Sequence, residues 1–149
     1  MGTRRRSREI IIQVFYALFY AETDQNFKHL DYINVYKEVL DYIAIENDIK
    51  PESSVYLFAE TSIKRIIVKI ETLDETIERH IGDYKIEKLG FVELIILRMA
   101  VYEMMYEKIP VAVMINEAVE LAKKYCAEKS PALINAILDK IKNSEVDHV

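Results

Sequence analysis

Residues 91–107 read FVELIILRMAVYEMMYE, and this stretch decides the fold class. Drawn as a helix, it is apolar on nearly every side, which is the pattern of a helix that other helices surround. Within residues 91–106, three charged residues interrupt the run, Glu93, Arg98 and Glu103, so it does not read as a membrane span. We therefore expect a buried central helix that ends at Pro110.

On both sides of this stretch, apolar residues recur at the three- and four-residue steps that are typical of helices. The expected helices cover about residues 3–21, 30–47, 54–70, 73–81, 113–125 and 130–141. Three glycines and three prolines supply too few turns for a β-sandwich or barrel. The sequence thus predicts an all-α protein of about seven helices, in two small bundles that share the buried central helix. We expect one domain over residues 1–149, with residues 1–3 and 144–149 frayed.

The composition excludes several classes of function. Apolar residues make up 51% of the 149 residues and charged residues 30%, which excludes disorder. The only cysteine, Cys126, excludes a disulfide framework and suits a reducing cytoplasm, so we expect a cytoplasmic protein without a secretory signal. The glycines stand at positions 2, 82 and 90, which leaves no phosphate-binding loop. Three histidines and one cysteine form no nucleophile–base pair, so we expect no enzyme, no cofactor and no metal site.

The charge of the chain is unevenly distributed. Residues 1–8 contain Arg4, Arg5, Arg6 and Arg8 and no acid, so this end carries +4 and the remainder −9 of the net −5. Guanidinium groups match the geometry of phosphate oxygens, and the free N–H groups of a helix start also favour anions. The cluster predicts a binding arm for a polyanion; a merely solvated arm is the alternative.

Three segments together resemble the NusB family of bacterial transcription antitermination factors. They are RRRSRE at 4–9 followed by QVFY at 13–16, LGFVE at 89–93 continuing into LRMAVYEM at 97–104, and IP at 109–110 followed by INEAVELAK at 115–123, AEKS at 127–130 and NAILD at 135–139. The resemblance implies a non-catalytic protein that binds the boxA element of nascent, single-stranded RNA together with NusE, a small-subunit ribosomal protein. It also implies assembly into the RNA polymerase antitermination complex and processive transcription of ribosomal RNA operons.

The resemblance and the residue chemistry together give a set of expected contacts. RNA contacts are expected at Arg4, Arg5, Arg6, Arg8, Tyr16, Lys129 and Ser130, and a protein-partner contact at Glu93. Tyr16 follows Arg8 by about two helical turns and would stack on a base, although a core tyrosine is the alternative. Ser130 could instead be a helix cap, and Glu93 could instead complement a helix dipole.

Some positions depart from the family pattern, and other functions stay open. Leu133 stands where relatives carry an aromatic residue, and Ala136 stands where they carry glycine. One alternative is a NusB-like accessory RNA-binding domain of a ribosomal RNA modification system. Another is a pure protein-interaction module whose arginines bind an acidic partner. A homodimer is also open, whereas no membrane partner is expected.

Overall fold

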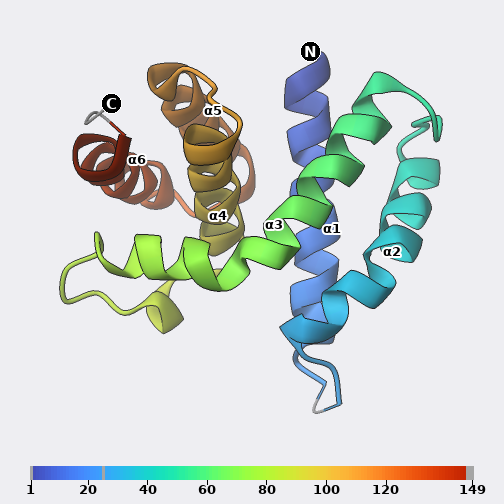
Figure 1. Cartoon of the computed structure of the whole chain (residues 1–149), viewed down its shortest axis with the longest axis horizontal. Coiled ribbons are helices and arrows are strands. Elements are labelled where there is room, and N and C mark those ends of the chain that lie inside the picture. Colours follow the sequence, from blue (N-terminus) through green and yellow to red (C-terminus); the bar gives the residue numbers. More distant parts are fainter. Residues whose placement is uncertain (1, 25, 147–149) are drawn as a thin grey trace. The chain divides into compact units, whose positions relative to one another are not determined.

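The computed structural model of the protein describes residues 2–24 and 26–146, and every regular element within them is helical (Figure 1). The α-helices are α1 (Thr3–Ala21), α2 (Tyr32–Glu46), α3 (Ser54–Glu78), α4 (Phe91–Tyr106), α5 (Val111–Tyr125) and α6 (Ser130–Ile141). Short 3-10 turns lie at His29–Asp31 and Ile86–Lys88, and a π-helical turn at Lys142–Val146. This confirms the all-α prediction. The helices expected at 54–70 and 73–81 are one continuous helix, α3, because neither glycine nor proline interrupts residues 54–81.

The chain divides into two compact units, Met1–Val68 and Lys69–Val149, and the boundary falls within α3. We expected the bundles to share the helix at 91–107, but α4 belongs wholly to the second unit, and α3 is the helix whose residues are divided. An apolar pattern on every side of a helix indicates burial without indicating which helices cover it. The assignment of one domain stays a prediction. Of the ends expected to fray, residues 1 and 147–149 lie outside the described part, whereas Thr3 opens α1 and residues 144–146 belong to the π-helical turn.

The first unit is built around the packing of α1 against α2. The buried side of α2 consists of every fourth residue, namely Tyr32, Tyr36, Leu40 and Ala44. The ring of Tyr32 is fully buried, with its centroid 6.4 Å from that of Phe15 and 6.3 Å from that of Phe19. Edge-on and tilted aromatic contacts of this kind add to the free energy of burial. They hold the start of α2 against the C-terminal half of α1.

A polar network joins α2 to the start of α3. The Nζ group of Lys37 donates a hydrogen bond to the Tyr56 hydroxyl at 2.8 Å, and that hydroxyl donates to Oδ1 of Asp41 at 2.5 Å. Lys37 also lies 3.5 Å from a carboxylate oxygen of Glu60. The hydrogen bond to Tyr56 raises the pKa of Lys37, and burial raises the pKa of Tyr56. Both residues therefore keep their protons at neutral pH, and the network stays closed.

The second unit buries α4 against α5 and α6. All ten residues from Ile95 to Met104 are buried, which confirms the buried helix predicted from the sequence. Among them, Arg98 reaches α3 and binds the Asp74 carboxylate through two hydrogen bonds of 2.7 Å each. α4 ends at Tyr106, where Lys108 adopts the left-handed conformation with a φ of 55°. None of the described helices is both long and apolar enough to cross a membrane.

Candidate nucleic-acid interface

The first two turns of α1 carry the four arginines, but the structure does not expose them equally. Arg4 and Arg6 are exposed and Arg5 is half-buried, whereas Arg8 is only 5% exposed. Arg8 lies three and four residues before the buried Ile11 and Ile12, so it belongs to the inward side of the helix. Arg8 therefore lacks the exposure of Arg4 and Arg6, although all four arginines were expected to contact RNA. Its contact with RNA stays a prediction.

Arg4 is held on α3. The centre of its guanidinium lies 3.7 Å from the centroid of the Phe58 ring, and the Ser7 hydroxyl one turn later donates to the Val55 carbonyl at 3.2 Å. Stacking on an aromatic ring occupies the face of a guanidinium and leaves the N–H groups at its edge available. Arg4 can therefore bind a phosphate while it remains stacked on Phe58.

Arg6 is held on the C-terminal end of α2. Its Nη2 group donates to the carbonyl oxygen of Asn47 at 2.9 Å, and the Asn47 side chain in turn donates to Gln13 at 3.2 Å. Asn47 is the C-cap of α2, where the helix dipole favours a cation. Asp48 follows in the left-handed conformation with a φ of 56°, and the amide of Ile49 reaches back to the Ala44 carbonyl at 2.8 Å to close the helix end. One of the five N–H donors of Arg6 is thus used, and the others remain for an anion.

The contacts of Arg4 and Arg6 fix the geometry of the site before any ligand binds. A side chain that is already ordered loses less conformational entropy on binding than a free one. The two exposed guanidinium groups also flank the start of α1, which has no side-chain cap. The free N–H groups of that first turn add a favourable field for phosphate. These features together make the start of α1 suited to a polyanion.

Tyr16 and a second tyrosine lie further along α1. Tyr16 is 47% exposed, so it is not the core tyrosine that was the alternative interpretation. Tyr20 is 66% exposed and lies four residues later, which places it on the same side of the helix. The sequence analysis missed Tyr20, although its spacing from Tyr16 is a signal that could have identified it. Both rings offer a face on which an unpaired base could stack.

In the second unit, Glu93 and Ser130 bind each other. The Ser130 hydroxyl donates to Oε2 of Glu93 at 2.5 Å, and the Gly90 amide donates to Oε1 of Glu93 at 2.8 Å. Ser130 is only 2% exposed, and the N-cap of α6 is Lys129. The interpretation of Ser130 as that N-cap was therefore wrong, because its hydroxyl is directed to Glu93. Lys129 is exposed at the start of α6, where it can meet a phosphate. Contacts of these residues with RNA or a partner stay predictions.

Cys126 lies beside this pair and is not suited to nucleophilic chemistry. Burial, and after it the charge of Glu93, raises the pKa of the Cys126 thiol to about 11, while its hydrogen bond with Ser130 acts in the opposite direction. A thiol with such a pKa is almost fully protonated at neutral pH, and the thiolate is the reactive form. Within residues 2–24 and 26–146, no group of three or more histidine, cysteine or acidic side chains could hold a metal ion.

Comparisons with known proteins found relatives of similar sequence and similar fold. Residues 5–143 match the sequence model of the NusB family. The transcription antitermination protein NusB of Thermodesulfovibrio yellowstonii is 35% identical over 97% of this chain and 95% of its own. The T. maritima NusB structure is 30% identical, covers 93% of this chain and 91% of its own, and has a TM-score of 0.73. A chain in the crystal structure of the antitermination factors NusB and NusE in complex with dsRNA is 26% identical, with a TM-score of 0.77 and coverage of 96% and 98%.

Proposed function

The chain belongs to the NusB family, and we propose on that basis that it binds the boxA element of nascent RNA together with NusE, a small-subunit ribosomal protein. In this proposal the complex joins the transcribing RNA polymerase in the cytoplasm and promotes transcription through ribosomal RNA operons. The role is one of binding and assembly, without catalysis.

One observation supports RNA binding most strongly. Arg4 and Arg6 are exposed at the start of α1, yet each is already fixed by a contact within the first unit, Arg4 on Phe58 and Arg6 on Asn47. Contacts with phosphates supply affinity and set the register of the strand. Base stacking on Tyr16 and hydrogen bonds to base edges would supply preference for a sequence, as single-stranded RNA allows. Lys129 would add a further cation.

Charge also supports a basic protein partner. Outside residues 1–8 the chain carries a charge of −9, which repels free RNA but attracts a basic ribosomal protein and raises its association rate. Both carboxylate oxygens of Glu93 accept hydrogen bonds within the second unit. We therefore assign Glu93 a supporting role in the second unit: it fixes the start of α6, and through it the position of Lys129.

The experiment that tests RNA binding is a fluorescence anisotropy titration of labelled boxA RNA against the parent and the double variant Arg5→Glu, Arg6→Glu. For single strands, log K falls with log salt by about 0.7 for each phosphate contact, so four arginines alone give a slope of roughly −3. The double variant should bind more weakly, and its negative slope of log K against log salt should be shallower by about 1.4. The control is Lys88→Glu, Lys140→Glu, which changes the net charge equally at exposed positions.

The same titration, repeated with NusE and with an acidic protein, separates the alternatives. We call residues 4–8 of α1 the arginine turn. Equal affinity of parent and double variant at moderate salt would show that the arginine turn does not contribute to RNA binding. A parent that binds an acidic protein but no RNA would identify a protein-interaction module. RNA binding that NusE does not alter would favour an accessory domain of a ribosomal RNA modification system. Thermal melting of each variant shows whether the fold is intact, and sedimentation of the parent shows whether a second copy binds.

A further inference from the structure

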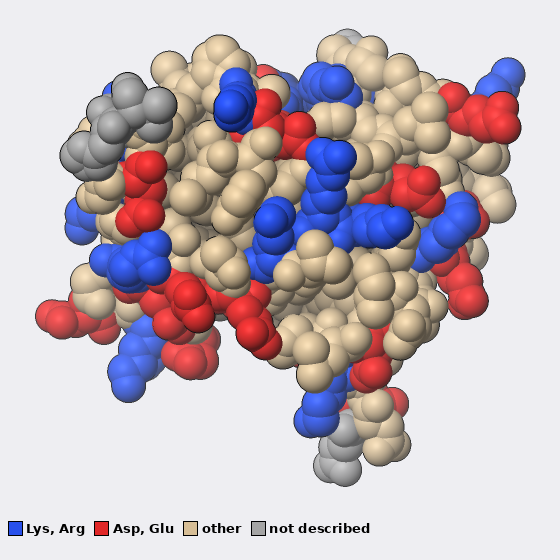
Figure 2. All heavy atoms as spheres, viewed as in Figure 1, with Lys and Arg blue, Asp and Glu red and all other residues tan. Residues whose placement is uncertain are grey.

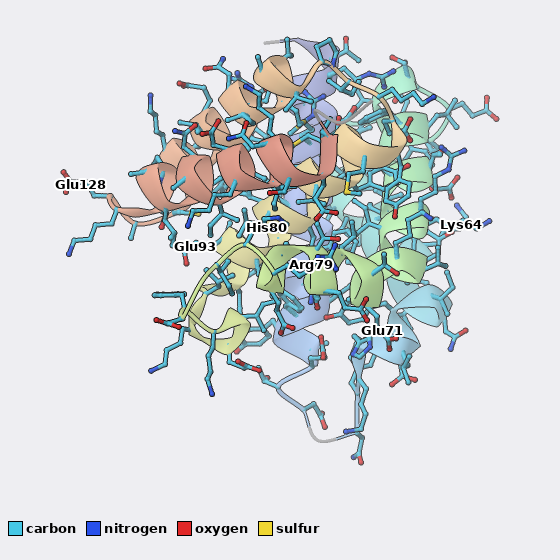
Figure 3. The ribbon with its side chains drawn as sticks, turned by 60° about the vertical axis from the view of Figure 1, so that its left-hand side comes forward. Lys64, Glu71, Arg79, His80, Glu93 and Glu128 are labelled. Carbon is cyan, nitrogen blue, oxygen red and sulfur yellow. The ribbon has the colours of Figure 1, made fainter. Side chains whose placement is uncertain are left out.

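A second basic segment lies in the first half of α3. Residues 61–69 read TSIKRIIVK and contain three cations and no acid, in a chain whose net charge is −5. Lys64 and Arg65 are both exposed. Lys64 has no ion-pair partner among the described residues, unlike Lys37, which pairs with Asp41 and Glu60. Figure 2 shows Lys and Arg side chains gathered along the middle of α3, and Figure 3 shows Lys64 directed away from the helix.

This segment continues directly from the arginine turn of α1. Arg4 stacks on Phe58, and Arg65 lies seven residues after Phe58, which places it two turns along on the same side of α3. At 1.5 Å per residue the separation along the helix axis is about 10 Å, which is close to the rise of three stacked nucleotides at about 3.4 Å each. A strand that binds Arg4 can therefore reach Lys64 and Arg65 within a few nucleotides.

Two exposed aliphatic residues bracket the cations. Leu57 is 51% exposed and Val68 is 68% exposed, and both fall on the side of α3 that carries Lys64. Sugars and unstacked bases present apolar surface that such side chains can cover, while phosphates bind the cations. Alternating cations and apolar contacts suit a single strand better than they suit a duplex, whose bases are stacked inside.

We infer that the exposed side of α3 from Leu57 to Val68 is a second RNA-binding surface, on which Lys64 and Arg65 bind the phosphates of nucleotides that flank the segment held by the arginine turn. The inference rests on the proposed RNA binding and extends it. It makes the site longer than the arginine turn, so RNA contacts beyond the boxA core contribute to affinity through charge and without a sequence requirement.

The test compares two labelled RNAs, boxA alone and boxA extended at both ends, binding to the parent and to Lys64→Ala, Arg65→Ala. With the extended RNA, the negative slope of log K against log salt should be shallower in the variant by about 1.4, since two phosphate contacts are lost. With boxA alone the two proteins should have the same slope. The control variant Lys88→Ala, Lys140→Ala should match the parent with both RNAs. The charge-retaining variant Lys64→Arg should also match it.

The outcomes separate this inference from the proposed function. A parent that fails to bind boxA RNA contradicts the proposed function itself. If the parent binds both RNAs with the same slope as the alanine variant, the inference is wrong while the proposed function stands. The exposed side of α3 would then bind an acidic protein or only face solvent. If the double variant has a lower melting temperature than the parent, the single variant Lys64→Gln replaces it in the test. Its negative slope should be shallower than that of the parent by about 0.7.

Discussion

Replacement of Asp74 by alanine should strongly destabilise the second unit, because it breaks an ion pair with a buried arginine. Asp74 on α3 binds Arg98 on α4 through Oδ1 to Nε and Oδ2 to Nη2, both at 2.7 Å. The Arg98 side chain is 8% exposed and that of Asp74 is 25% exposed. The variant would take the Asp74 carboxylate away from a guanidinium that stays buried.

The magnitude follows from the burial of Arg98. Removing one partner of a buried ion pair costs about 3–5 kcal/mol, because the other charge stays desolvated. A protein of this size has about 5–15 kcal/mol of stability in total, and each kcal/mol shifts the melting temperature by about 2–4 °C. We therefore expect the melting temperature to fall by about 6–20 °C.

The assay is thermal unfolding followed by circular dichroism, with urea titration to obtain the free energy of unfolding. Asp83→Ala is the matched control, since Asp83 is an exposed acid in the loop after α3, and it should change stability by less than about 0.5 kcal/mol. The apolar pair Asp74→Leu, Arg98→Met should recover most of the loss, because it removes both buried charges. If Asp74→Ala and Asp83→Ala have the same melting temperature, the ion pair between Asp74 and Arg98 does not hold α3 to α4.

Three further variants test the second unit. Leu97→Ala should cost about 2–5 kcal/mol in urea unfolding, because Leu97 is fully buried on α4; an unchanged midpoint would refute that burial. Ser130→Ala should cost about 1–3 kcal/mol, and in a double-mutant cycle with Glu93→Gln the two losses should not be additive; strict additivity would mean that the hydrogen bond is absent. Alkylation of Cys126 by iodoacetamide should rise with pH to a midpoint near 11, and Glu93→Gln should lower that midpoint; a midpoint near 9 in the parent would contradict the burial of the thiol.

The helical pattern of the sequence predicts where helices lie better than it predicts which side of each is buried. The bounds of the first helix, residues 3–21, match α1. In the second helix, expected over residues 30–47, Leu30 and Ile33 are apolar yet 70% and 39% exposed, whereas the buried side begins at Tyr32. Tyrosine reads as only partly apolar, yet three neighbouring aromatic rings bury this one completely.

In the candidate site, too, the sequence predicts which residues are present better than it predicts their contacts. Its arginines could be identified from composition alone, because four cations without an acid are visible in eight residues. The burial of Arg8 could not be predicted from composition, and neither could the stacking of Arg4 on Phe58, a residue 54 positions away. The bond between Ser130 and Glu93 likewise joins residues from two helices. Contacts between helices depend on how the helices pack, and the local periodicity of the sequence does not predict that packing.

The measurement that tests the central proposal most directly is the affinity of boxA RNA for the parent protein in the presence and in the absence of NusE. If the protein, NusE and RNA form one complex, NusE should tighten RNA binding by about 5- to 150-fold, the usual range for coupled sites. By linkage, boxA RNA should tighten the binding of NusE by the same factor, which a titration in the reverse order would measure. Equal RNA affinity with and without NusE, together with NusE affinity that boxA RNA does not change, would contradict the proposed assembly.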